Sequence, residues 1–312
     1  MSKILITTSS FNVDTPEVTA LESAGYEVVL NPHKRRLTAE EVSALLTPDV
    51  IGMIAGVEPL TADVLNKTQG LQVISRCGAG LDSVDAQAAQ QKNIKIFNTP
   101  DAPSAAVAEL TIGLILSVLR SIPLQDQAIR SGEWERPMGG LLGKKTLGLI
   151  GLGRIGMRVA QIAKSFGSTV IACDPYAKET DVADLISFDT LLKESDIISL
   201  HIPYTKENHH LINKKTLSAM KEGSVLINAS RGGLVDEDAA VQALQSEHLS
   251  AAAFDVFEEE PYTGPLTQIK NAVLTAHVGS YAKETRALQE AESAQNLLVG
   301  LTSDNEGIRA YG

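Results

Sequence analysis

The sequence predicts an α/β fold made of two doubly wound, parallel-sheet domains. Short apolar runs alternate with helical patterns along residues 1–99, which is the order expected of parallel strands joined by helices. The alternation stops at a polar, proline-bearing joint at 98–103 and at a loose stretch at 131–145, and then it resumes. A glycine-rich turn follows the first strand of the resumed pattern. These three observations carry the prediction.

The first half contains short runs rich in β-branched and aliphatic residues, each bounded by polar positions. The expected strands are Ile4–Thr7, Tyr26–Leu30, Val50–Ala55, Gln72–Ser75 and Ile94–Phe97. The intervening helices carry start signals. Thr15 precedes a proline, which fits the first turn of a helix. Thr38 and Glu41 form a capping-box pattern, and Thr61 opens a third helix.

The second half begins with a long apolar helix expected over 104–120, and strand–helix alternation restarts after the loose stretch. The expected strands are Thr146–Ile150, Thr169–Cys173, Ile197–His201, Val225–Ala229, Ala251–Asp255 and Val273–Ala276. A final helix is expected from 282 to about 301. We therefore expect a discontinuous first domain, residues 1–99 with 282–312, and a second domain, residues 100–281, with a cleft between them.

Composition limits the possible partners. The chain has 312 residues, with 27 Lys and Arg against 38 Asp and Glu, for a net charge of −11. Nucleic acid is not expected as a partner, because binding a phosphate backbone needs a basic surface. The longest apolar window, Ala105–Leu119, contains Glu109. It is too short to span a bilayer, so no membrane association is expected.

The chain has two cysteines, Cys77 and Cys173. Their separation in sequence fits neither a disulfide framework nor a zinc-binding pattern. The cysteine usage therefore favours a reducing, cytoplasmic location, and no metal is expected.

The sharpest motif is the turn Gly151-Leu-Gly-Arg-Ile-Gly156 between an expected strand and an expected helix. Gly151 permits a tight turn, Gly153 lets the backbone approach a pyrophosphate, and Gly156 lets helix and strand pack closely. The helix that starts at Arg154 and Ile155 presents free N–H groups and a partial positive charge to phosphates. The turn therefore predicts a dinucleotide site.

Asp174 ends the next strand, eighteen residues after Gly156. A carboxylate at this place accepts hydrogen bonds from the adenosine ribose and repels a 2′-phosphate. No Arg or Lys follows it before Lys178. The sequence therefore favours NAD over NADP.

Three polar residues follow strands of the second half: Arg231, Glu260 and His277. The carboxyl ends of parallel strands form the ligand crevice of such a sheet. Arginine can hold a carboxylate bidentately and polarise a carbonyl, and histidine can supply a proton near neutral pH. A carboxylate beside the histidine raises its pKa and orients its ring. The three residues suit the reduction of a 2-oxo acid to a 2-hydroxy acid.

Several longer motifs carry a family resemblance that covers nearly the whole chain. They are RCGAGLDSVD (76–85), AVAELTIGLIL (106–116), GLGRIG (151–156), LHIPYTKENHHLI (200–212), NASRGGLVDEDA (228–239), AAFDVFEEEP (252–261) and TAHVGS (275–280). With these motifs the chain resembles the D-isomer-specific 2-hydroxyacid dehydrogenases. The resemblance implies a flavodoxin-like substrate domain, a Rossmann NAD-binding domain and an NAD-dependent oxidoreductase.

The resemblance also implies roles for individual residues. Arg231 would bind substrate, His277 would be the general acid/base and Glu260 its partner. Asp255 would bind the carboxamide end of the nicotinamide. The implied substrate-binding residues are Arg76, Gly78, Ala79, Gly80, Ser104, Arg231 and His277. Further residues implied to line the cofactor site are His201, Pro203, Asn208, Ala229, Arg231, His277 and Gly279. His201 would contribute its backbone only, and Asn208 departs from the threonine common in the family.

The sequences of these motifs resemble those of 3-phosphoglycerate dehydrogenases and of hydroxypyruvate or glyoxylate reductases. His33-Lys34-Arg35-Arg36 is a basic cluster in an acidic chain. With Arg76 it could attract a substrate phosphate, which favours 3-phosphoglycerate and phosphohydroxypyruvate; a solvated loop is the alternative. The direction of the reaction stays open.

Other functions can use the same scaffold. Formate dehydrogenases usually have Gln where this chain has Glu260, so that function is disfavoured. Phosphite dehydrogenases keep Arg, Glu and His and stay open, and an NAD(H)-sensing corepressor is an alternative of another class. The family usually forms homodimers through the cofactor domain, and the stretch around Trp134 is the expected dimer arm. His33, His209, His210 and His248 are interpreted as surface residues.

Overall fold

The computed structural model describes residues 1–178 and 180–303. The chain divides into two compact units, Met1–Pro103 with Tyr281–Gly312 as unit 1, and Ser104–Ser280 as unit 2. Each unit is built on its own parallel sheet. The predicted α/β class with two doubly wound parallel sheets is confirmed. Residues 304–312 of the first predicted domain lie outside the described residues.

The sheet of unit 1 has the order β2-β1-β3-β4-β5, with every pair parallel. Its strands are β1 Lys3–Ile6, β2 Glu27–Leu30, β3 Val50–Ala55, β4 Val73–Arg76 and β5 Lys95–Asn98. Its helices are α1 Pro16–Ser23, α2 Ala39–Leu45, α3 Ala62–Lys67, α4 Ala86–Gln91 and α11 Lys283–Thr302. The predicted capping box is present, because Thr38 accepts the N–H of Glu41 and Glu41 accepts the N–H of Thr38.

Helices cover both faces of this sheet. Leu297 of α11 is fully buried with Ile54 and Val73 on one face. Val42, Leu65 and other residues of α2–α4 form a separate apolar cluster on the other. Burying each such aliphatic side chain contributes roughly 1.5–3 kcal/mol. The last helix therefore completes the core of the first unit, although the strands it covers lie at the other end of the chain.

The sheet of unit 2 has the order β12-β11-β10-β9-β6-β7-β8 and is also parallel throughout. Its strands are β6 Thr146–Ile150, β7 Thr169–Cys173, β8 Asp184–Leu185, β9 Ile197–Leu200, β10 Ser224–Asn228, β11 Leu249–Phe254 and β12 Ala272–Leu274. Its helices are α5 Ser104–Leu119, α6 Ile122–Arg130, α7 Arg154–Ser165, α8 Phe188–Glu194, α9 Lys214–Ala219 and α10 Glu237–Gln245.

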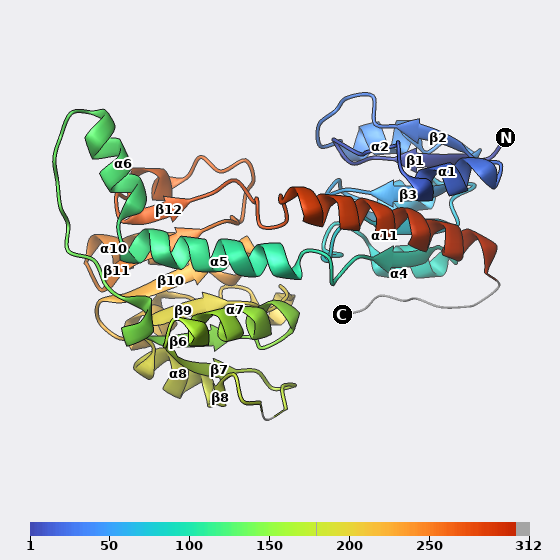
Figure 1. Ribbon diagram of the computed structural model, residues 1–312. Helices are drawn as coiled ribbons and strands as arrows, with labels where there is room; N and C mark the ends of the chain where they lie inside the picture. Colours follow the sequence, from blue (N-terminus) through green and yellow to red (C-terminus); the bar gives the residue numbers. More distant parts are fainter. Residues whose placement is uncertain (179, 304–312) are drawn as a thin grey trace. The chain divides into compact units, whose positions relative to one another are not determined.

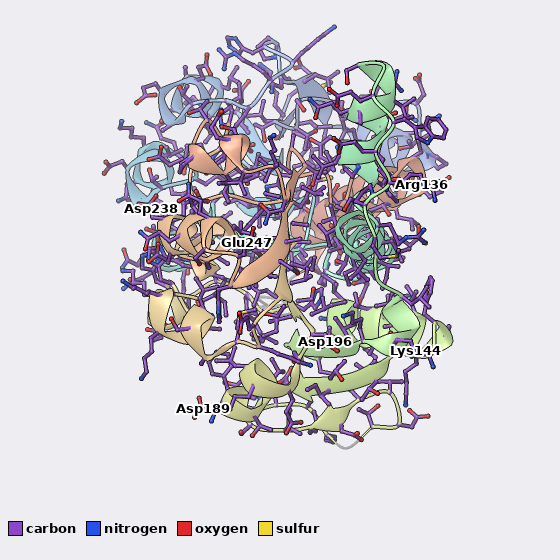
Figure 2. All side chains as sticks on the ribbon, turned by 90° about the vertical axis from the view of Figure 1, so that its left-hand side faces the viewer. Arg136, Lys144, Asp189, Asp196, Asp238 and Glu247 are labelled. Atoms are coloured by element: carbon purple, nitrogen blue, oxygen red, sulfur yellow. The ribbon has the colours of Figure 1, made fainter. Side chains whose placement is uncertain are left out.

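Unit 2 has an apolar core on each face of its sheet. Helices α5 and α7 lie side by side on one face (Figure 1) and share a cluster with β6 and β7. Helices α8, α9 and α10 contribute to the second cluster. At the amino end of the sheet, Asp196 accepts the N–H of Thr146 at 2.9 Å and Lys221 Nζ at 2.7 Å; Asp196 is labelled in Figure 2. The opposite, carboxyl end carries the loops described below.

No single described helix is both long and apolar enough to cross a membrane. Helices α5 and α6 reach the required length and apolarity only when taken together, and the chain bends by 62° between them. Most of α5 is buried.

Candidate active site

The glycine turn of unit 2 has the geometry that the sequence predicts. Gly151 follows β6 with a φ of +99°, a left-handed conformation that only glycine adopts at low cost. A Cβ at Gly156 would lie 2.2 Å from the carbonyl oxygen of Gly151, so helix α7 packs against the turn only because a side chain is absent. A Cβ at Gly153 would meet nothing within 4 Å.

The start of α7 fits a pyrophosphate. Gly153 is the N-cap and supplies no side-chain hydrogen bond, so this twelve-residue helix begins without a side-chain cap. Arg154 is exposed and Ile155 half-buried at the first turn. N–H groups without a side-chain cap, together with open space beside Gly153, are what an anionic ligand requires at a helix N-terminus. The residues present therefore fit the phosphates of a dinucleotide.

Asp174 holds the glycine turn from the next strand. Its Oδ2 accepts the N–H of Leu152 at 2.7 Å, and its Oδ1 accepts the N–H groups of Tyr176 and Ala177 at 2.8 and 3.2 Å. A carboxylate has about four acceptor positions, so one stays available for a ribose hydroxyl. Besides its predicted contact with the cofactor, Asp174 thus holds the glycine turn in place.

The loop after β9 carries three of the predicted cofactor residues. His201 N–H donates to Ile150 O at 2.7 Å, and its ring Nε2 lies 2.9 Å from Ser199 Oγ. Burial lowers the pKa of His201 to about 4, so the ring is neutral. Asn208 Nδ2 donates to Pro203 O at 2.8 Å, which closes this loop on itself. His201 therefore acts here through its backbone and ring packing.

Arg231 follows β10 on a fixed backbone. Asn228 Nδ2 donates to the carbonyl oxygen of Arg231 at 2.9 Å, and Arg231 Nη1 donates to Ser230 O at 2.7 Å. Ala229, two residues before it, is buried. A Cβ at Gly232 would lie 1.9 Å from the backbone of Phe257, so the loops after β10 and β11 are in direct contact.

His277 and Glu260 form a hydrogen-bonded pair between the loops that follow β12 and β11. His277 Nδ1 lies 3.1 and 2.9 Å from the two oxygens of Glu260. Glu260 Oε1 also accepts the N–H of Phe257 at 3.2 Å. With Nδ1 bound to the carboxylate, the imidazole presents Nε2 as its second reactive nitrogen. The pair that the sequence singled out is therefore assembled.

Asp255 positions the loop that carries His277. This residue is 1% exposed. Its Oδ1 accepts Thr275 Oγ1 at 2.6 Å and the N–H of Val278 at 2.9 Å, and its Oδ2 accepts the N–H of Gly279 at 2.8 Å. His277 itself has a positive φ, an uncommon conformation outside glycine. Sequence reasoning missed this role, because hydrogen bonds between residues far apart in the chain leave no local pattern.

The predicted substrate residues of unit 1 lie at the end of β4. Arg76 Nη1 donates to Cys77 O, and Gly78 has a φ of +147° beneath the guanidinium. The N–H of Gly78 donates to Arg76 O at 2.9 Å, so it is already used within the loop. Ala79 and Gly80 have N–H groups to which the described residues offer no acceptor. Of the predicted substrate-binding residues Gly78, Ala79 and Gly80, only the last two therefore keep an N–H group for a substrate. Ser104 is buried at the start of α5, in unit 2.

A glycine turn for NAD and an arginine with a histidine–carboxylate pair at neighbouring strand ends define a dinucleotide-dependent dehydrogenase. Residues 112–279 match the family model described as D-isomer specific 2-hydroxyacid dehydrogenase, NAD binding domain. The chain belongs to the D-isomer specific 2-hydroxyacid dehydrogenase family. It is an NAD-dependent enzyme of that family, which confirms the predicted activity class and cofactor.

Relatives with assigned names differ in substrate. The chain is 38% identical over 280 residues to a hydroxypyruvate reductase of Thermotoga maritima, covering 85% of this chain and 91% of the relative. It is 40% identical over 281 residues to a D-3-phosphoglycerate dehydrogenase of Methanocaldococcus jannaschii, covering 86% of this chain and 53% of the relative. The chain thus spans about half of the latter protein.

Solved structures share the architecture. The TT0316 protein of Thermus thermophilus has 35% identity and a TM-score of 0.87, with 96% of each chain covered. A D-lactate dehydrogenase of Aquifex aeolicus, complexed with NAD and lactic acid, has 29% identity and a TM-score of 0.84, covering 96% of this chain and 95% of that one.

Proposed function

We propose that this enzyme reduces a small 2-oxo acid to its D-2-hydroxy acid, with His277 as the proton donor. The observation that carries this proposal is the His277–Glu260 pair, with Nδ1 and Oε2 2.9 Å apart at the ends of adjacent strands. Bound NADH supplies the hydride that adds to the carbonyl carbon. His277 Nε2 gives its proton to the carbonyl oxygen, so the C=O bond becomes a C–O single bond with new C–H and O–H bonds.

Glu260 and Arg231 have separate tasks in this proposal. Glu260 accepts the Nδ1–H of His277, which fixes the ring and stabilises its protonated form before transfer. Arg231 carries a permanent charge on a backbone held by Asn228. Its guanidinium binds the substrate carboxylate and polarises the carbonyl. The N–H groups of Ala79 and Gly80 stay the predicted substrate contacts of unit 1. We accordingly assign unit 1 to substrate and unit 2 to the cofactor.

An unphosphorylated substrate, such as hydroxypyruvate or glyoxylate, is favoured over phosphohydroxypyruvate. The basic cluster at 33–36 suggested a phosphate site, but Arg35 donates to both oxygens of Glu41, at 2.9 and 2.5 Å. His33 Nδ1 lies 3.8 Å from the same carboxylate. Glu41 thus offsets one of the three permanent charges of this cluster, that of Arg35, which is engaged with the capping box of α2.

A panel of kcat/KM values over hydroxypyruvate, glyoxylate, pyruvate and phosphohydroxypyruvate, each with NADH and NADPH, tests this proposal. We expect hydroxypyruvate or glyoxylate to exceed phosphohydroxypyruvate at least tenfold, about 1.4 kcal/mol. NADH should exceed NADPH roughly 100-fold, because Asp174 would face the 2′-phosphate and like charges cost several kcal/mol.

The matched variant is Arg35→Ala, which should leave the ratio between phosphorylated and unphosphorylated acids within about twofold, roughly 0.4 kcal/mol. A selective rise in KM for phosphohydroxypyruvate would instead restore 3-phosphoglycerate as the substrate pair. Formate and phosphite belong in the panel as negative controls. If the protein turns over neither these two compounds nor any 2-oxo acid, an NAD(H)-sensing role is favoured instead.

We further propose a homodimer formed through unit 2. Large apolar side chains are exposed on α6 and on the extended segment after it; they are Ile122, Ile129, Trp134, Met138 and Leu141. Trp134 is 80% exposed, and such grouped exposure is typical of an interface. Light scattering after gel filtration should give twice the chain mass, and Trp134→Ala should shift the protein toward the monomer. A monomeric wild type at micromolar concentration would contradict this assembly.

The cytoplasmic location stays a prediction, with both cysteines free.

A further inference from the structure

Two histidines and a glutamate from separate loops of unit 2 lie together outside the catalytic set. His210 Nε2 lies 2.8 Å from Glu258 Oε1, and His209 Nδ1 lies 3.9 Å from the same oxygen. These ligand atoms are all within 4.8 Å of one another. We propose that His209, His210 and Glu258 form a binding site for a divalent transition metal, of which Zn²⁺ is the best match.

The spacing of the three side chains suits tetrahedral zinc. With Zn–N and Zn–O bonds of about 2.0–2.2 Å, the ligand atoms of a tetrahedral ion are about 3.3–3.5 Å apart. The observed 2.8 and 3.9 Å fall on either side of this value. The two imidazoles are stacked, with centroids 3.8 Å apart and planes inclined by 25°. Lone pairs of stacked rings lie in nearly parallel planes, so His209, whose side chain is 47% exposed, would rotate out of the stack to reach the ion that His210 and Glu258 bind.

The backbone holds the histidines on this side of the loop. His210 has a positive φ, a left-handed conformation that is costly for a bulky residue and is often found at functional sites. Its N–H donates to Gly233 O at 2.8 Å, and its carbonyl accepts Asn213 Nδ2 at 2.9 Å. Tyr204 packs edge-on against His209. The ring of His210 is therefore directed toward Glu258 before any ion arrives, whereas His209 Nδ1 lies 3.3 Å from Tyr204 Oη and would exchange that contact for the ion.

The donor set selects the class of ion. Two imidazole nitrogens with one carboxylate oxygen are ligands that Zn²⁺ prefers, whereas Mg²⁺ and Ca²⁺ prefer all-oxygen sites. The carboxylate of Glu237 accepts the N–H of Glu258 at 2.9 Å and adds negative charge nearby. A cation would offset this charge. The remaining coordination position would be taken by water.

A metal here would join the loop after β9 to the loop after β11, two residues before Glu260. Binding to the folded state alone raises stability by RT ln(1 + [L]/Kd). Zinc should therefore raise the melting temperature of this enzyme. This inference is independent of the substrate proposed above, because it needs no turnover.

Zinc binding to the full-length, tag-free protein, stripped with chelator, tests the site by calorimetry and by cobalt(II) absorption. We expect one high-affinity Zn²⁺ per chain and none for Mg²⁺. His210→Gln should weaken zinc binding by about 100-fold, at least the loss typical of disturbing a metal site. Glu258→Gln should do the same, and both should abolish the zinc-dependent rise in melting temperature.

Two control variants locate the ion. His33→Gln removes an exposed histidine that faces a single carboxylate, Glu41, and should not change zinc affinity. His277→Asn removes the histidine that pairs with Glu260, and it should also leave the zinc affinity unchanged. Absence of binding up to millimolar zinc, or loss of binding in His277→Asn but not in His210→Gln, would overturn the proposal. In that event the His210–Glu258 contact is an ion pair only.

Discussion

Replacing His277 with asparagine should lower kcat for 2-oxo acid reduction by about 10²–10⁴-fold, the range typical of losing a general acid. The affinity for NADH should stay near the wild-type value, because the glycine turn and Asp174 lie on other strands. Asparagine is the substitution of choice because the residue has a positive φ, and asparagine tolerates this region better than most residues. The loop held by Asp255 should therefore keep its course.

Three measurements separate lost chemistry from a lost fold. They are kcat and KM with the best acid of the panel, NADH fluorescence titration, and the melting temperature. Glu260→Gln is the matched variant, since it removes the charge that stabilises protonated His277 but leaves Nε2 in place. We expect a smaller fall in kcat than for His277→Asn, because the proton-donating nitrogen is still present. A kcat within about threefold of wild type for His277→Asn would remove this residue from the mechanism.

Replacing Gly156 with alanine should reduce both stability and NADH binding. The new Cβ would lie 2.2 Å from Gly151 O, and the obstructing atom is backbone rather than a flexible side chain that could move. Overpacking of this kind costs about 1–3 kcal/mol, more than the roughly 1 kcal/mol that alanine gains over glycine inside a helix. The difference is a net loss of up to about 2 kcal/mol, which lowers the melting temperature by up to roughly 8 °C in a unit of this size.

Gly153→Ala is the control that distinguishes packing from ligand space. Its Cβ would meet nothing within 4 Å, and its φ of −73° suits alanine. The expected stability loss is under about 1 kcal/mol, from a poorer N-cap. The methyl group would nevertheless occupy the space beside the first N–H groups of the helix, so NADH affinity should fall at least tenfold, about 1.4 kcal/mol. Unchanged NADH binding in Gly153→Ala would place the pyrophosphate elsewhere.

Local signals account for most of the architecture that the sequence predicted. The strand–helix alternation, the capping box of Thr38 and Glu41 and the turn at 151–156 all depend on neighbouring residues, and each is present in the structure. Phe166 shows the limit of periodicity. Its spacing places it on the buried face of α7, yet the structure has it as the C-cap, 48% exposed, because the helix ends one residue earlier. The short strand β8, with two exposed residues, had no apolar pattern to reveal it.

Spacing rules applied to the sequence could not predict the proposed metal site, for a related reason. His209 and His210 are adjacent in sequence, and Glu258 lies far beyond them in the chain, so no zinc motif is formed along the sequence. The same applies to Arg35. Its sequence neighbours are basic and suggested a phosphate site, whereas folding of α2 brings Glu41 to its guanidinium.

The sequence by itself determined the fold class and the NAD turn, and it predicts Arg231, Glu260 and His277 as the catalytic set, since these depend on residue type and position relative to strand ends. Tertiary structure decided how these residues are held and which charges are already paired. Asp255 fixes the His277 loop, Asp174 fixes the glycine turn, and Glu41 engages Arg35. The physical reason is that hydrogen bonds and ion pairs act over about 3 Å in space, and only the folded sheet brings distant residues within that range.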